Sequence, residues 1–411
     1  MIAVNAARNR SLIALLLLAL VAGAFVAGYG YGQGRAVAGA DADSRGFALL
    51  RDVLHQIRST YIRRDVDSDA LFHGAARGML EALGDPYSRF MDPSGYKGFR
   101  ETLSGVFSGV GILIDLADGG PVVVQPIPDT PAGRAGIRPG DRIVAVDERK
   151  TERMSLEEVV SRIRGQAGTK VTLTLQRAGK RFDLTLTRAR IVNQTVRGER
   201  FLEEADRAAL RSARVAYLRI VSFDEPTASA FGAALDGVLR GGARGLLLDL
   251  RTNGGGLLDA AVTIADRFVP AGEAIVHTVD RDGRRRTERA SRGPKVQIPV
   301  VVLVNEFTAS ASEIVTGALR DHEIARIVGV RTFGKGVIQR ILSLPGGTGA
   351  TLTSGRYLTP DGHDIHGKGL APDLAAGRRL EGRSDLEIRQ IDAAQFGAAL
   401  TVLKQQIAQR R

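Results

Sequence analysis

In the last third of the chain, a short apolar run is followed directly by a helical pattern, an order of elements that is typical of α/β proteins. The run, Pro299 to Val304, is rich in valine and too short for a helix, so it predicts a buried strand that ends at Asn305. Apolar residues then recur at helical spacing, at Ala311, Ile314, Val315, Ala318 and Leu319. Ser310 therefore lies at a strand-to-helix turn, where free N–H groups and the helix dipole would stabilise a developing oxyanion.

Ser310 has two interpretations. In the first, Ser310-x-x-Glu313 is a capping box that satisfies free N–H groups and has no chemical role. In the second, Ser310 is a nucleophile, which needs a neighbouring base. Lys335 stands in a Gly-Lys-Gly segment downstream, and a desolvated lysine can be neutral, whereas an arginine stays charged. Spacing alone leaves Ser312 open as the nucleophile.

Lysine is rare in this chain, although 57 residues are basic. The lysines are Lys97, Lys150, Lys170, Lys180, Lys295, Lys335, Lys368 and Lys404. Among them, only Lys335 lies between glycines and beside a strand-like alternation, in which Val337, Gln339 and Ile341 share one face. Lys335 is therefore the predicted base.

These residues resemble the motifs of carboxyl-terminal processing peptidases, also called tail-specific proteases. The shared pieces are Asn305-x-x-Thr308-Ala309-Ser310-Ala311-Ser312-Glu313, Phe333-Gly334-Lys335-Gly336 and Gln339. The resemblance implies that Ser310 is the nucleophile, Lys335 the general base and Gln339 the side chain that orients the lysine. It covers roughly residues 45 to 405. No H-E-x-x-H motif occurs, which argues against a zinc protease, and neither a metal nor a cofactor is expected.

Two neighbouring patterns indicate other chemistry and are disfavoured. Gly329-x-x-x-x-Gly334-Lys335 imitates a phosphate-binding loop, but Gly336 stands where a Ser or Thr would bind magnesium. His363 and His366 permit a Ser-His-Asp interpretation, yet the resemblance places both in a late strand and turn, and the base of the family is lysine.

Charge and composition limit the classes of molecule that this chain is expected to bind. The net charge of +12 and pI near 10.3 could indicate nucleic acid. However, only 5% of residues are aromatic, arginine is spread throughout, and no nucleic-acid motif is present, so nucleic acid is not an expected partner. Attraction to anionic lipid is the more modest inference. The absence of cysteine excludes disulfides and thiol catalysis and is compatible with an oxidising compartment.

Residues 1–40 predict a signal peptide or an N-terminal membrane anchor. Two arginines precede an uncharged apolar run, Leu12 to Gly28, of about 17 residues, the lower limit for a spanning helix. Ala36-Val37-Ala38 and Ala38-Gly39-Ala40 both fit a cleavage site, so cleaved and anchored forms are both open. Export is expected, to the bacterial periplasm or the outer face of the inner membrane.

Residues 41–95 form a predicted helical segment. Helical periodicity extends from Phe47 to Leu83, with a turn at Asp65 to Asp69. The family resemblance implies that these helices help to form a dimer in some members. A homodimer or higher oligomer and an activating partner protein are therefore expected.

Residues 96–190 predict a β-rich domain with short strands and glycine turns, interrupted by one helix, Ser155 to Arg164. The region resembles a PDZ domain, with Pro139-Gly140-Asp141 as its turn. The resemblance places Gly109, Val110, Gly111 and Ile112 in the peptide-binding loop, where N–H groups capture a C-terminal carboxylate while the peptide adds as a strand. Arg164 matches a position that links bound peptide to the protease core in some relatives.

Residues 191–380 return to alternating strands and helices, and residues 381–411 add a C-terminal amphipathic helix. Strands are predicted at Val215 to Val221 and Gly245 to Leu250, with a helix at Thr227 to Arg240 between them. The segment Asn253-Gly254-Gly255-Gly256 allows close approach of backbone to a ligand, so Gly255 is the predicted second oxyanion donor beside Ala311.

The sequence as a whole predicts a multidomain α/β protein: an α/β serine-protease core with an inserted PDZ-like β-rich domain and flanking helical segments at both ends. The resemblance implies a serine endopeptidase with a Ser/Lys dyad that cleaves exported polypeptides recognised through their C-terminal tails. The alternative is a non-catalytic PDZ adaptor with a protease-like half. Ser310, Lys335 and Gln339 argue against an adaptor, because all three are intact.

Overall fold

The computed structural model describes residues 42–117 and 120–410, so the predicted leader, residues 1–40, lies outside the described residues. The chain divides into two compact units after Ala75. The first contains a helix over residues 42–60 and the start of α2 (Ser68–Glu81), in agreement with the predicted helical pair. No helix in the described residues has both the length and the apolar character needed to cross a membrane.

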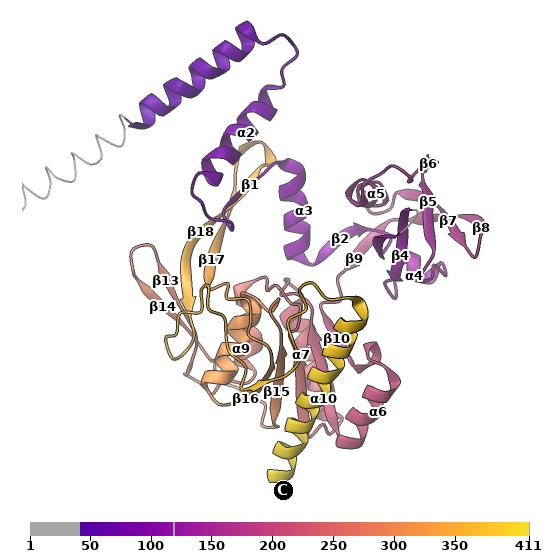
Figure 1. Cartoon of the computed structure of the whole chain (residues 1–411), viewed down its shortest axis with the longest axis vertical. Helices are drawn as coiled ribbons and strands as arrows, with labels where there is room; N and C mark the ends of the chain where they lie inside the picture. Colours follow the sequence, from indigo (N-terminus) through magenta and orange to yellow (C-terminus); the bar gives the residue numbers. More distant parts are fainter. Residues whose placement is uncertain (1–41, 118–119, 411) are drawn as a thin grey trace, which may run out of the picture. The chain divides into compact units, whose positions relative to one another are not determined.

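The second unit is built on a six-stranded sheet in the order β10-β11-β12-β15-β16-β19 (Figure 1). These strands are β10 (Val196–Gly198), β11 (Val215–Ile220), β12 (Gly245–Asp249), β15 (Val300–Val304), β16 (Ala325–Gly329) and β19 (Leu374–Ala375). All pairs are parallel except β10 with β11. Every residue of β12 and β15 is buried, as expected for central parallel strands that read as continuous apolar runs.

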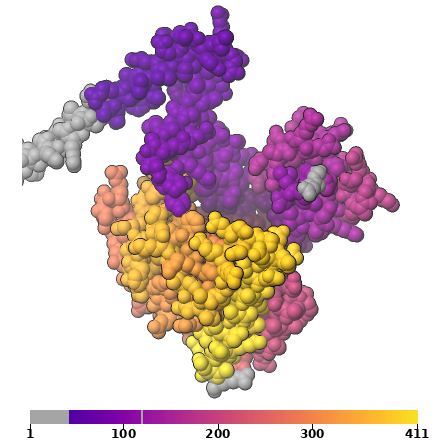
Figure 2. Space-filling model, viewed as in Figure 1, coloured from indigo at the N-terminus to yellow at the C-terminus, as the bar shows by residue number. Residues whose placement is uncertain are grey.

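Helices cover both faces of this sheet. One face packs on α7 (Thr227–Arg240), α8 (Leu258–Asp266) and α9 (Ala311–Asp321). The other packs on α6 (Glu204–Ala213), which follows the short η1 (Glu199–Phe201), and on α10 (Asp385–Gln409). Figure 2 shows the yellow surface of α10 and of the chain before it on the face of the molecule that is in view. The predicted strands and the α7 and α9 helices are present, so the short valine-rich runs correctly indicated the central strands.

A second sheet lies beside the core, in the order β1-β18-β13-β14, with β17 paired to β18. Its strands are β1 (Arg89–Met91), β13 (Ala274–Asp280), β14 (Arg285–Arg289), β17 (Val337–Ser343) and β18 (Gly349–Leu358), with η2 (Pro345–Gly347) before β18. Neither β1 nor the following α3 (Pro93–Ser104) was predicted from the sequence. A three-residue strand is too short to show alternation, but Asp92 at the N-cap and Pro93 at the first helical position are a recognisable start signal for α3.

The predicted PDZ-like domain contains a sheet in the order β3-β4-β5-β7-β8, with β6 paired to β5. Its elements are β3 (Ile112–Ala117), β4 (Gly120–Pro126), α4 (Pro131–Arg134), β5 (Arg142–Val146), β6 (Arg149–Lys150), α5 (Leu156–Ile163), β7 (Lys170–Arg177) and β8 (Lys180–Thr187). An antiparallel ribbon of β2 (Val106–Gly109) and β9 (Ala189–Val192) forms the entry and exit of the domain. The prediction of a single helix here was incomplete, because the one-turn α4, capped by Thr130, was missed.

Candidate active site

Ser310 occupies a strained turn between β15 and α9. Its backbone has φ 55° and ψ −118°, a conformation that costs a non-glycine residue about 1–3 kcal/mol. The Ser310 N–H donates to Glu313 Oε2 at 2.9 Å, which is the carboxylate half of the predicted capping box. The N–H of Glu313 donates to the Ser310 carbonyl oxygen at 2.8 Å. Ser310 thus begins α9 as the predicted capping box requires, on a strained backbone.

One cavity of about 650 Å³ is lined by all five residues that were predicted to act in catalysis. These residues are Gly255, Ser310, Ala311, Lys335 and Gln339. Ser312, the alternative nucleophile, does not line this cavity. Its side chain is fully buried, and its hydroxyl donates to the Asn253 carbonyl oxygen at 3.0 Å. The geometry therefore favours Ser310.

Glu313 connects the nucleophile turn to the segment that bears the base. Its carboxylate is fully buried and accepts N–H groups from Gly334 (2.8 Å) and Lys335 (2.9 Å) and the hydroxyl of Thr332 (2.6 Å), in addition to the Ser310 N–H. Burial raises the pKa of Glu313, and the four hydrogen bonds oppose that rise. Two donors face each oxygen, so the arrangement suits the ionised carboxylate.

Tyr357 on β18 ties the same two segments together from the other side. Its hydroxyl lies 3.0 Å from the carbonyl oxygen of Ser310 and 2.5 Å from that of Lys335, so the phenol donates to this pair of acceptors. The side chain is buried, and burial raises the pKa of Tyr357 well above its usual range, which keeps the hydroxyl a donor. Sequence reasoning predicted neither this role nor that of Glu313 beyond its own helix.

Lys335 has the electrostatic surroundings of a base. Burial lowers the pKa of Lys335, and the nearby positive charge of Arg89 lowers it further, whereas Asp85 acts in the opposite direction. A lower pKa increases the fraction of neutral amine, the form that can accept a proton from serine.

The side chains of Ser310 and Lys335 are not hydrogen-bonded to each other in the described structure. Among the described residues, no hydrogen bond joins the Lys335 amine to Ser310 or Gln339, and Gln339 Nε2 is buried without a partner. A bulge in β17 between Ile338 and Gln339 breaks the alternation that the sequence predicted, so both of these consecutive side chains line the cavity.

The two predicted oxyanion donors differ in their bonding. Ala311 is the first residue of α9, and no hydrogen bond from its N–H is present in the part of the chain that the structure describes. Gly255 lies against the nucleophile, since an added Cβ would stand 2.7 Å from Ser310 Cβ, but its N–H donates to Asn253 Oδ1 at 2.9 Å. The Gly255 N–H could donate to an oxyanion only after its hydrogen bond to Asn253 is broken. The role of Gly255 as the second oxyanion donor therefore stays a prediction.

The chain is similar to known proteins over most of its length. A family model described as peptidase family S41 matches residues 214–376, a PDZ domain model matches residues 122–177, and a model of the N-terminal domain of the activating protease CtpB matches residues 34–95. The chain is 38% identical over 331 residues to the carboxy-terminal processing protease CtpA of Bacillus subtilis (strain 168), covering 80% of this chain and 69% of that protein. The chain belongs to peptidase family S41.

Other relatives of this S41 peptidase carry similar names. The carboxyl-terminal-processing protease of Synechocystis is 36% identical over 351 residues, 84% of this chain and 80% of that protein. The solved structure of the photosystem II D1 C-terminal processing protease is 35% identical and covers 83% of this chain and 92% of that chain, with a TM-score of 0.47. The family models and the carboxy-terminal processing proteases show that the chain is a serine peptidase with a PDZ domain, and the predicted family and fold class are confirmed.

The PDZ domain of this S41 peptidase has an open groove of about 340 Å³, which the predicted residues Gly109 to Ile112 line. Strand β3 is at the edge of its sheet, so no strand of the described residues pairs with one side of its backbone. Gly111 has φ +81°, and a Cβ there would meet the Thr130 hydroxyl oxygen at 2.3 Å, so only glycine fits this turn.

Arg164 caps the C-terminal end of α5 and also lines the groove. Its guanidinium pairs with Glu101 of α3 at 3.2 Å and lies 5.2 Å from the centre of the Phe107 ring. The predicted linking residue therefore contacts α3. That helix presents Phe99 and Leu103 to the Ser310 cavity, whereas Glu101 lines the groove.

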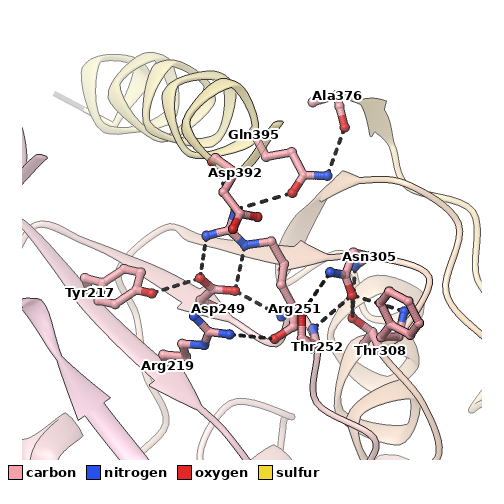
Figure 3. A network of polar contacts seen from close by, with 11 residues as sticks. Tyr217, Arg219, Asp249, Arg251, Thr252, Asn305, Thr308, Ala376, Asp392 and Gln395 are labelled. Atoms are coloured by element: carbon pink, nitrogen blue, oxygen red, sulfur yellow. Dashed lines mark hydrogen bonds and ion pairs between the residues drawn. The ribbon is translucent and has the colours of Figure 1, made fainter. Parts of the chain in front are cut away.

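A buried ion network fixes the chain before the triple glycine (Figure 3). Arg251 pairs with Asp249 at 2.7 Å, and its guanidinium also donates to the Asp392 carboxylate (3.1 Å) and to the Gln395 amide oxygen (3.3 Å) on α10. Asp249 also accepts the Tyr217 hydroxyl at 2.8 Å. The C-terminal helix is thereby connected to the loop that carries Gly255.

One group in the described part of the chain has ligand atoms close enough to hold a metal ion. Asp321, Asp361 and His363 each offer one such atom, all within 4.8 Å of one another. The Asp321 carboxylate is already paired with Arg320 at 2.8 Å, which leaves less negative charge for a cation. The group therefore supports no metal role.

Proposed function

We propose that this S41 peptidase hydrolyses peptide bonds with Ser310 as nucleophile and Lys335 as general base. The observation that carries the proposal is the shared cavity, in which a serine hydroxyl on a strained turn faces the same space as a lysine of lowered pKa. Lys335 would take the proton of Ser310 as the hydroxyl attacks the peptide carbonyl and return it to the leaving amine, and water would release the acyl-enzyme. Gln339 would orient the amine.

We also propose that the substrates are exported polypeptides presented by their C-terminal tails. The open edge of β3 and the glycine turn at Gly109 to Ile112 support this, because a tail can add as a strand while backbone N–H groups bind its carboxylate. The leader pattern in residues 1–40 supports export to the periplasm or the outer face of the inner membrane. A homodimer and an activating partner remain predictions from the family resemblance.

Cleavage of an unstructured protein tests the dyad and excludes the adaptor alternative. Ser310→Ala and Lys335→Arg should each abolish cleavage while the fold is retained, because arginine keeps the charge but cannot accept a proton. Lys368→Arg, at an exposed lysine, is the matched control and should cleave normally. Turnover by Lys335→Arg would remove Lys335 from the mechanism, and an intact substrate with the unaltered protein would favour the adaptor.

The pH dependence of the rate gives a second test. Lys335 must be neutral to act, and its neutral fraction rises as the pH rises through its pKa. Because burial lowers that pKa, activity should rise from neutral toward alkaline pH and level off before the range in which a free lysine titrates. A rate that falls over this range would contradict a lysine base.

A further inference from the structure

The segment that contains Asp85 and β1 carries an aromatic ring into the Ser310 cavity. Tyr87 lines the cavity just before β1. Strand β18 of the second sheet holds this segment, because the Thr351 hydroxyl donates to the Tyr87 carbonyl oxygen at 3.0 Å and the Thr353 N–H donates to the hydroxyl of the next residue, Ser88, at 3.0 Å. These bonds fix the segment before β1 and thereby the position of the Tyr87 ring in the cavity.

The Tyr87 ring faces the amine of the base. Lys335 Nζ lies 4.7 Å from the centre of the ring, within the range of a cation–π contact. The His366 ring meets Tyr87 edge-on, with its centre 6.2 Å away. The tyrosine ring thus has neighbours that limit its movement.

This contact attracts one protonation state only. The negative face of an aromatic ring binds an ammonium group, whereas a neutral amine gains little from it. In the described structure the amine lies at the ring and has no hydrogen bond to Ser310 or Gln339, and Gln339 Nε2 lacks a partner. Gln339 Nε2 is thus an unused hydrogen-bond donor for the lone pair of the neutral amine, and both residues line the same cavity.

We propose that Tyr87 is a positioning residue for the base: its ring holds the protonated Lys335 away from Ser310 and releases it toward Ser310 and Gln339 when the amine loses its proton. This inference rests on the proposed role of Lys335. The ring stabilises the ammonium form, so it acts against burial and delays deprotonation. Tyr87 thereby helps to set the pH at which the dyad becomes competent.

Other titratable groups lie close to Lys335 and are unchanged when only Tyr87 is replaced. Asp85 and Arg89 from the β1 segment act on the amine through their charges. Glu313 from α9 and Tyr357 from β18 bond to the Lys335 backbone, and the His366 ring beyond β18 contacts the Tyr87 ring. Burial and the nearby Asp85 and Glu313 carboxylates raise the pKa of Tyr87, so its phenol is neutral at the pH at which the lysine is tested.

The test compares Tyr87→Leu with Tyr87→Phe in the full chain, using the pH dependence of kcat/KM on an unstructured protein. Phenylalanine keeps the aromatic ring, so the rise of kcat/KM with pH should occur at the same pH as in the unaltered protein. Leucine keeps apolar bulk but removes the ring that stabilises the ammonium form, so this rise should move to lower pH by about 0.4 to 1.5 units. A merely structural role would lower the rate at every pH without moving this rise, and that result would overturn the proposal.

A second measurement does not depend on activity. In the Ser310→Ala protein labelled with ¹³C at lysine Cε, the shift of the Lys335 signal, assigned with Lys335→Arg, reports protonation directly. Tyr87→Leu should titrate at lower pH than Tyr87→Phe. If Lys335 titrated at the same pH in both variants, the proposed role of Tyr87 would be overturned. Cleavage by Lys335→Arg would instead refute the Ser310–Lys335 dyad. The two failures can be told apart, because the titration does not depend on cleavage.

Discussion

The Ser310 cavity and the PDZ groove each place a glycine next to backbone that can receive a ligand, but different interactions hold the two sites in shape. In the cavity, the buried carboxylate of Glu313 and the buried phenol of Tyr357 bond directly to the segments of the nucleophile and base. In the groove, Thr130 holds Gly111 by close packing and by a longer hydrogen bond of 3.3 Å to its carbonyl oxygen, and the ion pair of Arg164 is partly exposed. Polar substitutions should therefore have larger effects in the cavity than in the groove.

The largest expected effect is at Glu313. Glu313→Gln replaces an acceptor oxygen with an amide N–H group that faces two donors, which displaces the Ser310 turn relative to Lys335. A displacement of about 1 Å can reduce a rate about 100-fold, so kcat should fall by at least that factor. The measurement is turnover at saturating substrate, with thermal unfolding recorded alongside.

Glu381→Gln, at an exposed glutamate, is the control and should behave as the unaltered protein. If Glu313→Gln cleaved at the normal rate, the cavity would be no more dependent on polar contacts than the groove, and the contrast between the two sites would be lost.

Next in size is the effect of the substrate's own C-terminus on the groove. Amidation of a tail removes the charged acceptor of backbone N–H groups near Gly111, an interaction of about 1.5–3 kcal/mol, so binding should weaken about tenfold or more. The measurement is tail affinity for Ser310→Ala, which recognises substrate without cleaving it. Equal affinity for the free and amidated tails would place recognition elsewhere.

A smaller effect is expected for Tyr357→Phe. The change removes one shared hydroxyl and keeps the ring, so the free energy of unfolding should fall by about 1 kcal/mol and kcat about 3- to 10-fold. Chemical denaturation and turnover measure the two effects. Tyr61→Phe, at an exposed tyrosine, is the matched control. A loss of activity as complete as that of Lys335→Arg would show that the phenol participates in the chemistry.

The smallest effect is expected for Arg164→Ala. Exposed ion pairs contribute about 0.2–1 kcal/mol, so loss of the contact with Glu101 should reduce stability and tail affinity less than about fivefold. Turnover at saturating substrate decides what else Arg164 does. If maximal turnover were normal, the PDZ domain would only tether the substrate. If the variant bound tails but turned over slowly at saturation, ligand binding would help to assemble the Ser310 site.

Patterns of neighbouring residues in the sequence predicted the strands and helices that depend on interactions between neighbouring residues. The valine-rich run at Pro299 to Val304 indicated β15, and the helical spacing after Ser310 indicated α9, because each signal is contained in a few consecutive residues. The contacts of Glu313 with Thr332, Gly334 and Lys335 were not predicted, since they join segments that only tertiary packing brings together.

The same limit applies to the neighbours of the base. The β1 segment that brings Tyr87 and Arg89 to Lys335 is distant in sequence and too short to show a pattern. The bulge at Gln339 is likewise set by pairing with β18 and is invisible in the alternation of β17 itself. The identity of the site residues could be predicted, but their electrostatic surroundings could not.

Helix α3 lines both sites, with Phe99 and Leu103 at the Ser310 cavity and Glu101 and Thr102 at the groove. Different residues of one helix thus line the two sites, so a substitution that moves the helix at one site also moves it at the other. With the tail in the groove and the cleaved bond in the cavity, as proposed, a change in the preference of one site is transmitted to the other. Lineages that acquire a new substrate should therefore show paired changes in these two sets of α3 residues.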